Sequence, residues 1–429
     1  MNFNSISEKV EKHILPFANK LSSQRHLRAI RDAFMSLLPI TLLGGIASVI
    51  GAAPVTETTT NGFLLAWADF AAQNSAVLSW INALTLGGMA LYICMGITYF
   101  LSKHFKMDVF IPMMITMFGF MMLVCNPIEL GWAGSSIDIS YIGGQGLLPA
   151  MLVAFVGVEL YHYMREHNWG RITLPPSVPA SLTEVFAGLV PAFLTLAVYV
   201  VIWIVFNALG TNFTAFIYSI ISPALSAADS LGFTILVTLL LHLFWFFGIH
   251  DAAFGAVLGP IRDGNLSINA AAQAAGQALP HVFTTSFWVY FVIIGGCGSV
   301  LALAILLLTS KSKQLKTVGR VGIVPAFFGI SEPIIFGVPL MMNPIFFIPF
   351  LLTSTVNGII SFLLIDSGVI AKTFAMLSWQ MPSVFGAFLS TMDIKAPVLI
   401  IVLILIDMLI YFPFFKIQEK QCLAMEKED

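Results

Sequence analysis

Long apolar runs separated by short polar segments extend over most of this chain. A helix needs about 20 consecutive apolar residues to cross the hydrocarbon core of a bilayer. Residues 214–229 form a shorter apolar run that is interrupted by Pro223. This run and the longer ones together predict an all-α membrane protein with about ten transmembrane helices. The longer runs cover residues 33–52, 79–101, 107–126, 142–163, 184–208, 231–250, 283–309, 341–365 and 397–415.

The positions of Lys and Arg predict which polar segments face the cytoplasm, because cytoplasmic loops carry an excess of these residues. Segments 53–77, 127–141 and 209–213 contain neither residue, so we expect them to face outward. An odd number of crossings is then needed between the last of these segments and Lys311. Three crossings give ten in all and place both termini in the cytoplasm. Lys and Arg occur in the N-terminal segment and at residues 103–106, 165–171, 311–320 and 416–420.

Residues 321–365 contain a single ionisable side chain, Glu332, in apolar surroundings. Burying a carboxylate at membrane depth costs about 2.5–3.5 kcal/mol, so such an acid is first interpreted as a functional site. Prolines and glycines interrupt the segment, and irregular backbone at this depth is tolerated where it faces protein or a wet cavity. We therefore predict a re-entrant hairpin loop around Glu332. A second partly inserted loop at 370–393 accounts for Lys372 and Lys395, which otherwise disturb the charge pattern.

Three further side chains are candidates for contact with a ligand. His250 ends the apolar run LLLHLFWFFGIHD, where an imidazole can both donate and accept hydrogen bonds. Asn343 offers an amide, and Trp379 offers a large ring that can stack on a ligand. Each has a structural alternative: a histidine bonded to a backbone carbonyl, an amide that fills freed backbone bonds, and an interfacial anchor. For Glu332 the alternative is a carboxylate bonded to the N–H groups of a broken helix.

Composition supports a membrane protein and excludes several classes of function. Hydrophobic residues make up 58% of the chain and charged residues 10%, and a net charge of −2 argues against a nucleic-acid partner. The four cysteines form no CxxC pair and no His/Cys cluster, so we predict neither disulfides nor a metal or other cofactor. The sequence has no phosphate-binding loop and no kinase signature. Its energy source is therefore expected to be an ion gradient or a phosphoryl donor on another protein.

The N-terminal segment, residues 1–32, is predicted to carry an amphipathic helix on the inner membrane face. Pro16 weakens this prediction, and a solvated lead-in segment is the alternative. We see no cleaved signal peptide in this segment. Residues 416–429 form a polar cytosolic tail. The apolar positions that repeat at helical spacing are Ile6, Val10, Ile14, Phe17 and Leu21.

One element of the sequence is specific, GISEPIIFG followed by an NP pair at residues 329–344, together with LFWFFGIH at 243–250. With these segments the chain resembles one family, the enzyme IIC component of the bacterial phosphoenolpyruvate-dependent sugar phosphotransferase system, in its lactose/cellobiose/diacetylchitobiose branch. The resemblance covers nearly the whole chain. Other matching segments are HLRAIRDAFMSLLPITLLGG, GGQGLLPAMLVAFVGVELY, LPPSVPASLTEVFAGLVPAF and GGCGSVLALAILLL.

The resemblance implies a homodimer in the bacterial inner membrane. The first membrane half, residues 33–213, is expected to form most of the dimer contact, and the second half, 214–415, to hold the sugar. It also implies that a disaccharide from outside is phosphorylated at a 6-hydroxyl by a phosphocysteine on a separate cytosolic IIB protein, and is released inward. The acid and the histidine of the family's motifs fall on Glu332 and His250, which are then the expected catalytic residues.

Three departures from the family pattern flank the expected pocket. Ser331 stands where the family often has Asn, Asp251 where it often has Gly, and Gln380 and Met381 where it often has two Thr. Exchanged donors change which hydroxyl pattern a site satisfies, so they leave the sugar open. The expected sugar-binding residues are Glu332, His250, Trp379, Asn343 and Ser331.

A β-linked disaccharide is the expected substrate, with cellobiose or diacetylchitobiose ahead of lactose. The main alternative is an ion-coupled secondary sugar transporter in which Glu332 and His250 relay protons. A membrane sensor that binds sugar without turnover is a third reading, and nothing in the sequence favours it.

Overall fold

The computed structural model describes residues 24–55, 59–129, 134–173, 175, 179–249 and 254–426. Within these ranges the chain is largely helical, with one short antiparallel hairpin formed by β1 (Asn126–Glu129) and β2 (Ser135–Asp138). His250, Asp251 and most of the predicted N-terminal amphipathic helix lie outside the described residues. The expectations for them stay predictions.

Among the described residues, five helical segments are long and apolar enough to cross a membrane. The pair α2 (Arg25–Ser36) and α3 (Leu38–Gly51), bent by 46° at its break, can count as a sixth. Two shorter apolar helices are α7 (Phe110–Leu123) and α11 (Leu231–Phe246). This confirms the all-α polytopic membrane fold, although fewer than ten helices cross by length alone. The five segments are Ser75–His104, Gly144–Glu166, Val185–Ala208, Phe347–Asp366 and Lys395–Met425.

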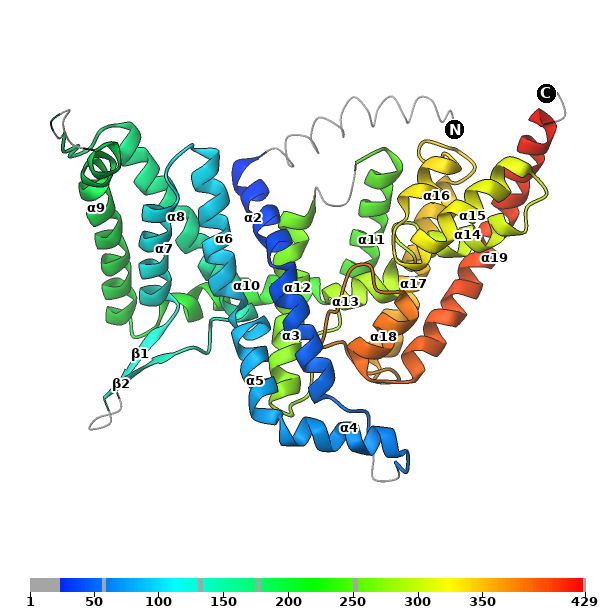
Figure 1. Ribbon diagram of the computed structural model, residues 1–429, viewed down its shortest axis with the longest axis horizontal. Coiled ribbons are helices and arrows are strands. Elements are labelled where there is room, and N and C mark those ends of the chain that lie inside the picture. Colours follow the sequence, from blue (N-terminus) through cyan, green and yellow to red (C-terminus); the bar gives the residue numbers. More distant parts are fainter. Residues whose placement is uncertain are drawn as a thin grey trace.

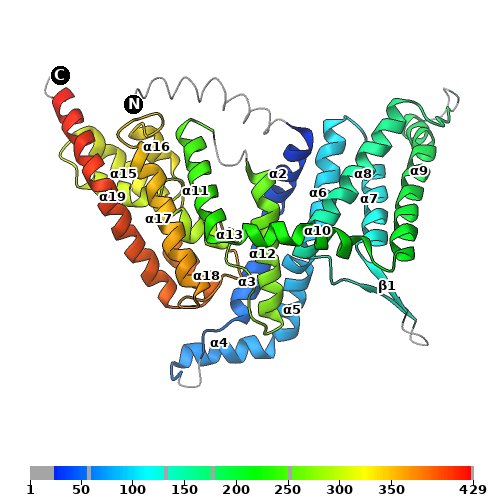
Figure 2. The same cartoon turned by 180° about the vertical axis from the view of Figure 1, so that it is seen from behind.

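The helices fall into two groups on either side of a central set (Figures 1 and 2). The central set contains α2, α3 and α12 (Gly255–Ala274), with α4 (Gly62–Gln73) at one end. One flanking group contains α6 (Met89–His104), α7, α8 (Leu147–Glu166) and α9 (Ala180–Ala208), and α5 (Ser75–Leu84) packs against α3 of the central set. The other contains α11, α13 (Thr285–Phe287), α14 (Val300–Leu308), α15 (Lys313–Phe327), α16 (Glu332–Gly337), α17 (Phe347–Asp366), α18 (Ser383–Thr391) and α19 (Lys395–Met425).

Helix α10 (Phe213–Ala228) runs across the molecule between the two groups (Figures 1 and 2). It covers the short apolar run with Pro223 whose status as a span was open. Helix α12, by contrast, lies alongside α2 and α3 and was not predicted as a helix. Its charged residues Arg262 and Asp263 lower the hydropathy of a segment that is largely buried. The pattern of apolar runs therefore missed this helix.

The predicted span at 283–309 is not one continuous helix. A π-helical turn, η5 (Trp288–Val292), follows α13, and the chain then turns irregularly before α14. Gly295, Gly296 and Gly298 have φ values of 78°, 97° and 77°, a region that favours glycine. The apolar composition of this stretch concealed the break from the hydropathy pattern.

Buried side-chain hydrogen bonds hold the broken segment in place. The amide of Asn357 on α17 donates to the Ser299 hydroxyl at 3.0 Å and to the Asp407 carboxylate at 2.8 Å. The hydroxyl of Tyr411 on α19 donates to the carbonyl oxygen of Gly298 at 2.6 Å. These bonds satisfy polar groups that lack water at membrane depth. They tie the break to the two long helices α17 and α19.

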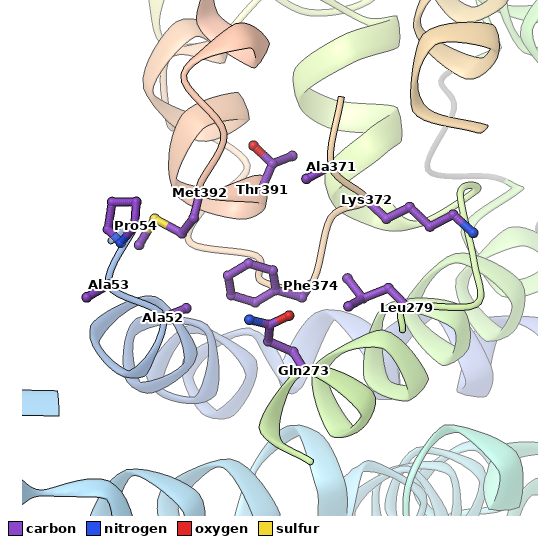
Figure 3. A pocket seen from close by; sticks show the side chains of 10 residues that line it. All are labelled: Ala52, Ala53, Pro54, Gln273, Leu279, Ala371, Lys372, Phe374, Thr391 and Met392. Carbon is purple, nitrogen blue, oxygen red and sulfur yellow. The ribbon is translucent and has the colours of Figure 1, made fainter. Parts of the chain in front are cut away.

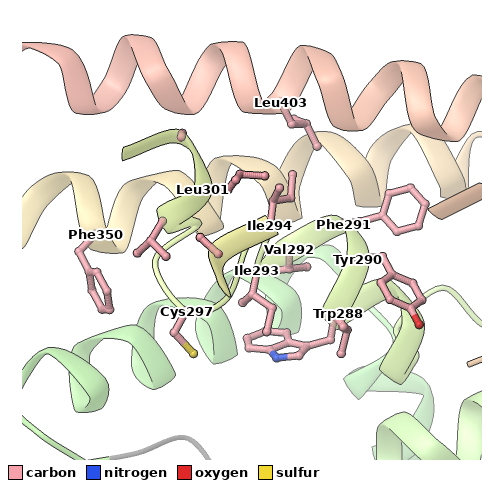
Figure 4. Close-up of a cluster of buried hydrophobic side chains, with 14 of the residues drawn as sticks. Trp288, Tyr290, Phe291, Val292, Ile293, Ile294, Cys297, Leu301, Phe350 and Leu403 are labelled. Atoms are coloured by element: carbon pink, nitrogen blue, oxygen red, sulfur yellow. The ribbon is translucent and has the colours of Figure 1, made fainter. Parts of the chain in front are cut away.

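The largest apolar core lies around this break. It joins η5 to α14, α17 and α19, and Figure 4 shows Trp288, Tyr290 and Phe291 gathered in it with Leu403 on the facing helix. A second core lies among α2, α6, α7 and α8, and Ala270 of α12 belongs to it. The two cores correspond roughly to the two halves of the chain. The assignment of 33–213 to dimerisation and 214–415 to sugar binding stays a prediction.

The two predicted re-entrant regions contain broken backbone. Helix α16 has only six residues and lies between α15 and α17, with turns on both sides. Residues 371–378 form an extended segment without helix or strand, and α18 follows them. Both regions position side chains at the centre of the molecule.

Candidate functional site

A central cavity of about 510 Å³ lies between the central helices and the broken segments of the second half. This volume falls within the usual range of small-molecule sites, about 300–1,000 Å³. Residues from α2, α3 and α12 line one side of it. The two broken regions of the second half line the other, so the cavity is bounded by elements far apart in sequence.

Glu332 and Ser331 line this cavity, as the sequence analysis expected of a ligand site. Glu332 is the first residue of α16 and is half-buried, and Ser331 is buried. Gly296 packs against them so closely that a Cβ there would meet the Ser331 side chain at 2.7 Å. The carboxylate therefore sits where two interrupted segments meet.

Trp379 also lines the cavity, on the extended segment that precedes α18. The guanidinium of Arg262 lies 5.7 Å from the ring centroid of Trp379 and 5.4 Å from that of Trp288. Such cation–π contacts are worth about 0.5–2 kcal/mol and fix the orientation of the rings. Trp379 is thus held by α12, the helix that the hydropathy pattern missed.

The backbone leading to Trp379 is held by side chains rather than by a helix or a sheet. The hydroxyl of Tyr290 donates to the carbonyl oxygen of Ser378 at 2.8 Å, and that of Ser286 to the carbonyl oxygen of Ala375 at 2.6 Å. The amide of Asn269 donates to the carbonyl oxygen of Thr373 at 2.8 Å. Elements α12, α13 and η5 therefore position the extended segment.

Three charged side chains of the cavity were not predicted from the sequence. Arg31 lines it from α2 and donates to Asp32 at 2.8 and 2.9 Å, and Arg262 and Asp263 line it from α12. The carboxylate of Asp263 accepts a short hydrogen bond from the hydroxyl of Thr285. The signal that was available is the Arg-Asp pair at 262–263 inside a segment of small and apolar residues.

The structure does not bring Asn343 to the cavity. Its side-chain oxygen accepts from the backbone N–H of Ile345 at 3.0 Å, and its amide nitrogen lies 3.5 Å from the side-chain oxygen of Gln418. This is the alternative role, an amide that satisfies a turn. His250 lies outside the described residues. Another histidine, His242, is buried on α11, and its Nδ1 lies 2.8 Å from the carbonyl oxygen of Thr238.

The cavity chemistry suits a neutral polar ligand. It offers two carboxylates, Glu332 and Asp263, two guanidinium groups, Arg31 and Arg262, and the ring of Trp379, around a partly apolar wall. No cluster of three or more His, Cys, Asp or Glu side chains that could hold a metal ion occurs among the described residues.

Comparison with known proteins gives a consistent set of relatives. The family model for the phosphotransferase system EIIC matches residues 31–354. The oligo-beta-mannoside-specific EIIC component of Bacillus subtilis (strain 168) is 31% identical over 98% of this chain and 96% of the relative. The lactose-specific EIICB component of Streptococcus mutans serotype c is 33% identical over 99% of this chain and 74% of the relative.

A solved structure has the same fold. It is that of the transporter ChbC, the IIC component from the N,N'-diacetylchitobiose-specific phosphotransferase system. The match has a TM-score of 0.87 and 29% sequence identity, and it covers 97% of this chain and 99% of ChbC.

Proposed function

The chain belongs to the phosphotransferase system EIIC family, and from that premise we propose that it imports a β-linked disaccharide while a phosphorylated IIB protein phosphorylates the sugar at a 6-hydroxyl. The observation that carries the proposal is the position of Glu332, a carboxylate at the wall of a cavity of about 510 Å³. Trp379 lines the same cavity and offers a ring for stacking on the sugar.

The chemistry asks the protein mainly to position two oxygens and to stabilise charge. The sugar O6 attacks the phosphorus of the IIB phosphocysteine, an O–P bond forms, and the S–P bond breaks to leave a cysteine thiolate on IIB. The O6 proton passes to Glu332, whose carboxylate also orients the hydroxyl. General-base assistance of this kind contributes about 10²–10⁴-fold to the rate.

Positive charge is available for the transferring phosphoryl group. Arg31 and Arg262 line the cavity from the central helices, opposite α16. Fixed cations near a developing phosphoryl charge stabilise the transition state. His250 belongs to this proposal as a second group on the same hydroxyl, by its place in the matching motif. Ser331, buried beside Glu332, is proposed as a sugar contact, and Asn343 is not retained.

The proposed sugar follows from the names of the relatives and from the positions at which this chain departs from the family pattern. The relatives' names give oligo-beta-mannoside, lactose and N,N'-diacetylchitobiose, all sugars with β linkages. Cellobiose or diacetylchitobiose stays ahead of lactose. The phosphoryl donor is proposed to be a IIB protein, since the lactose-specific relative of Streptococcus mutans is itself named an EIICB component.

We also propose a homodimer in the bacterial inner membrane with both termini in the cytoplasm. Within the apolar helix segment Val185–Ala208, only 17% of the most apolar 18-residue stretch is buried. Phe193, Val201 and Ile204 are among its exposed side chains. An apolar face of this size on α9 needs cover from lipid or from a second copy. Its place in the first half supports that half as the dimer contact.

Product analysis tests the proposal. Membrane vesicles that contain the protein are given phosphorylated IIB on the cytoplasmic side and labelled cellobiose or diacetylchitobiose on the other. We expect disaccharide 6-phosphate to accumulate on the cytoplasmic side, in proportion to the phosphorylated IIB consumed. Accumulation of unmodified sugar driven by a proton gradient alone would contradict the proposal and favour the ion-coupled alternative.

A further inference from the structure

A second cavity, of about 300 Å³, lies at the end of the molecule away from the described ends of the chain. It is lined by the turn after α3 at Ala52–Pro54, by the C-terminal end of α12, by residues 371–374 and by the end of α18. In the proposed orientation this end faces outward. The cavity therefore lies where a sugar would first meet the protein.

The lining of the second cavity fits a neutral polyol. Figure 3 shows the ring of Phe374 at its centre, with the amide of Gln273 pointing toward it. Thr391 also lines the cavity, and its hydroxyl donates to the carbonyl oxygen of Ala387 at 2.7 Å. The ammonium of Lys372 extends away and donates to the carbonyl oxygen of Pro280 at 2.8 Å. The amide of Gln273 can hydrogen-bond to a sugar hydroxyl, and the buried ring of Phe374 forms the apolar base beneath it.

A small apolar cluster lies between this cavity and the central one. It consists of Val49, Phe374, Ala375 and Leu377, all buried. Phe374 lines the outer cavity, and Leu377 lines the central cavity. The extended segment thus has one end at each cavity. Its middle forms the wall between them.

Helix α3 closes the wall from the other side. The Cα of Gly45 packs so tightly on the segment that a Cβ there would lie 1.9 Å from the carbonyl oxygen of Met376. Val49, one turn further along α3, belongs to the apolar cluster. The segment itself is hydrogen-bonded to Asn269, Ser286 and Tyr290, on the side of α12, α13 and η5. On the side of α3 the contacts are the close packing of Gly45 and the apolar side chain of Val49, which can separate without breaking the bonds to Asn269, Ser286 and Tyr290.

We propose that the outer cavity is an entry site for the disaccharide, and that the cluster of Val49, Phe374, Ala375 and Leu377 is the seal that separates it from the central cavity. This inference rests on the proposed function, because an entry site has meaning only if sugar passes inward. The seal opens between α3 and the extended segment. Phe374 serves both parts, as the floor of the entry site and as the largest side chain of the seal.

The seal is tested with Cys297, which lines the central cavity. A membrane-impermeant maleimide is applied to the outer face of sealed vesicles, and labelling of Cys297 is followed by mass spectrometry of its peptide. We expect Phe374→Ala to raise the labelling rate about tenfold over the wild type, because the lost ring increases the open population. The control Phe362→Ala removes a buried ring of α17 that lines neither cavity, and leaves the rate unchanged.

The entry site is tested with Gln273→Leu. Removing one hydrogen-bonding amide is expected to lower the uptake rate at low external sugar about two- to tenfold. The Kd of purified protein for the same sugar, set by the central cavity, is expected to stay within about twofold of the wild type. The control Gln277→Leu changes an exposed side chain nearby that does not line the cavity. It should leave both quantities unchanged.

Two results overturn the inference. If Cys297 in Phe374→Ala is labelled at the wild-type rate, the cluster is not a seal. If Gln273→Leu takes up sugar at the wild-type rate, the outer cavity is not an entry site. Neither readout depends on the chemical form of the product. Failure of the proposed function is recognised separately, as sugar that arrives inside without a phosphate.

Discussion

The hydroxyl of Tyr290 donates a hydrogen bond to the carbonyl oxygen of Ser378 over 2.8 Å. The same hydroxyl accepts from the backbone N–H groups of Leu377 and Ser378, each at 3.3 Å. The ring lies against Gly386 of α18, where a Cβ would meet it at 2.4 Å. One side chain therefore fixes the backbone that carries Trp379 to the central cavity.

Tyr290→Phe removes this hydroxyl and keeps the ring that packs on Gly386. We expect the Kd for the disaccharide to rise about three- to tenfold, because Trp379 loses its fixed position when a buried hydrogen bond is lost. Isothermal titration in detergent measures it. Tyr199→Phe is the matched control, since that buried hydroxyl donates to the carbonyl oxygen of Val153 at 2.8 Å in the other core. An equal loss of affinity in both variants would contradict a specific role for Tyr290.

The irregular turn before α14 is expected to contribute to the free energy of unfolding. Gly298→Ala places a Cβ 2.3 Å from the ring of Phe350 at a φ of 77°, so it combines backbone strain with overpacking. We expect a loss of about 2–5 kcal/mol in stability. Gly368→Ala has nearly the same φ, 75°, with nothing within 4 Å of the added Cβ. Gly368→Ala should therefore lose only the stability that backbone strain costs, about 1–2 kcal/mol.

Thermal unfolding in detergent compares the two glycine variants. We expect a larger fall in Tm for Gly298→Ala than for Gly368→Ala. Equal falls would show that the packing of Phe350 against the break contributes nothing.

The turn between α10 and α11 is predicted to respond to pH through Asp229. Burial raises the pKa of this carboxyl, but hydrogen bonds from His281 and from the backbone N–H groups of Phe283 and Val282 outweigh it and hold the pKa below the ordinary value of 3.8. The folded state therefore favours the carboxylate. Its contribution to stability is present above pH 3.8 and is lost as the pH falls through the lower folded-state pKa.

Asp229→Asn should accordingly lower Tm at pH 7, by the loss of charge-assisted hydrogen bonds worth about 1.5–3 kcal/mol. The difference from the wild type should shrink as the pH is lowered below 3.8. Asp366→Asn changes an exposed carboxyl at the end of α17 and serves as the control. A deficit that is the same at every pH would show that the charge of Asp229 is not the cause.

The apolar pattern and the breaks in it predicted much of the fold. Runs of about 20 apolar residues corresponded to helices, and the proline- and glycine-rich stretch around Glu332 became the short helix α16. The pattern failed where burial and hydropathy disagree. Helix α12 carries Arg262 and Asp263 into the interior, and the stretch around Gly298 is apolar but not helical. Hydropathy reports composition, and it does not report which polar groups find partners.

The candidate site was predicted in part. Glu332 and Trp379 were identified because an acid and a large ring beside proline breaks are unusual in an apolar chain, and both line the central cavity. Arg31 was missed because it lies about 300 residues before Glu332 in the sequence and only the fold brings it to the cavity. Arg262 was missed because it lies on α12, a helix that was not predicted. Asn343 does not line the cavity, and its side chain bonds to its own turn; the sequence left both roles open because an amide in a turn and an amide facing a ligand have the same local sequence.

The most direct test of the central claim, that Glu332 is the base for phosphorylation of the imported sugar, is single-turnover transfer from phosphorylated IIB to bound disaccharide. Glu332→Gln should slow the transfer by about 10²–10⁴-fold, while the sugar Kd changes by less than about tenfold. Glu166→Gln, at an exposed position at the end of α8, is the control and should transfer normally. Transfer by Glu332→Gln at the wild-type rate would contradict the account.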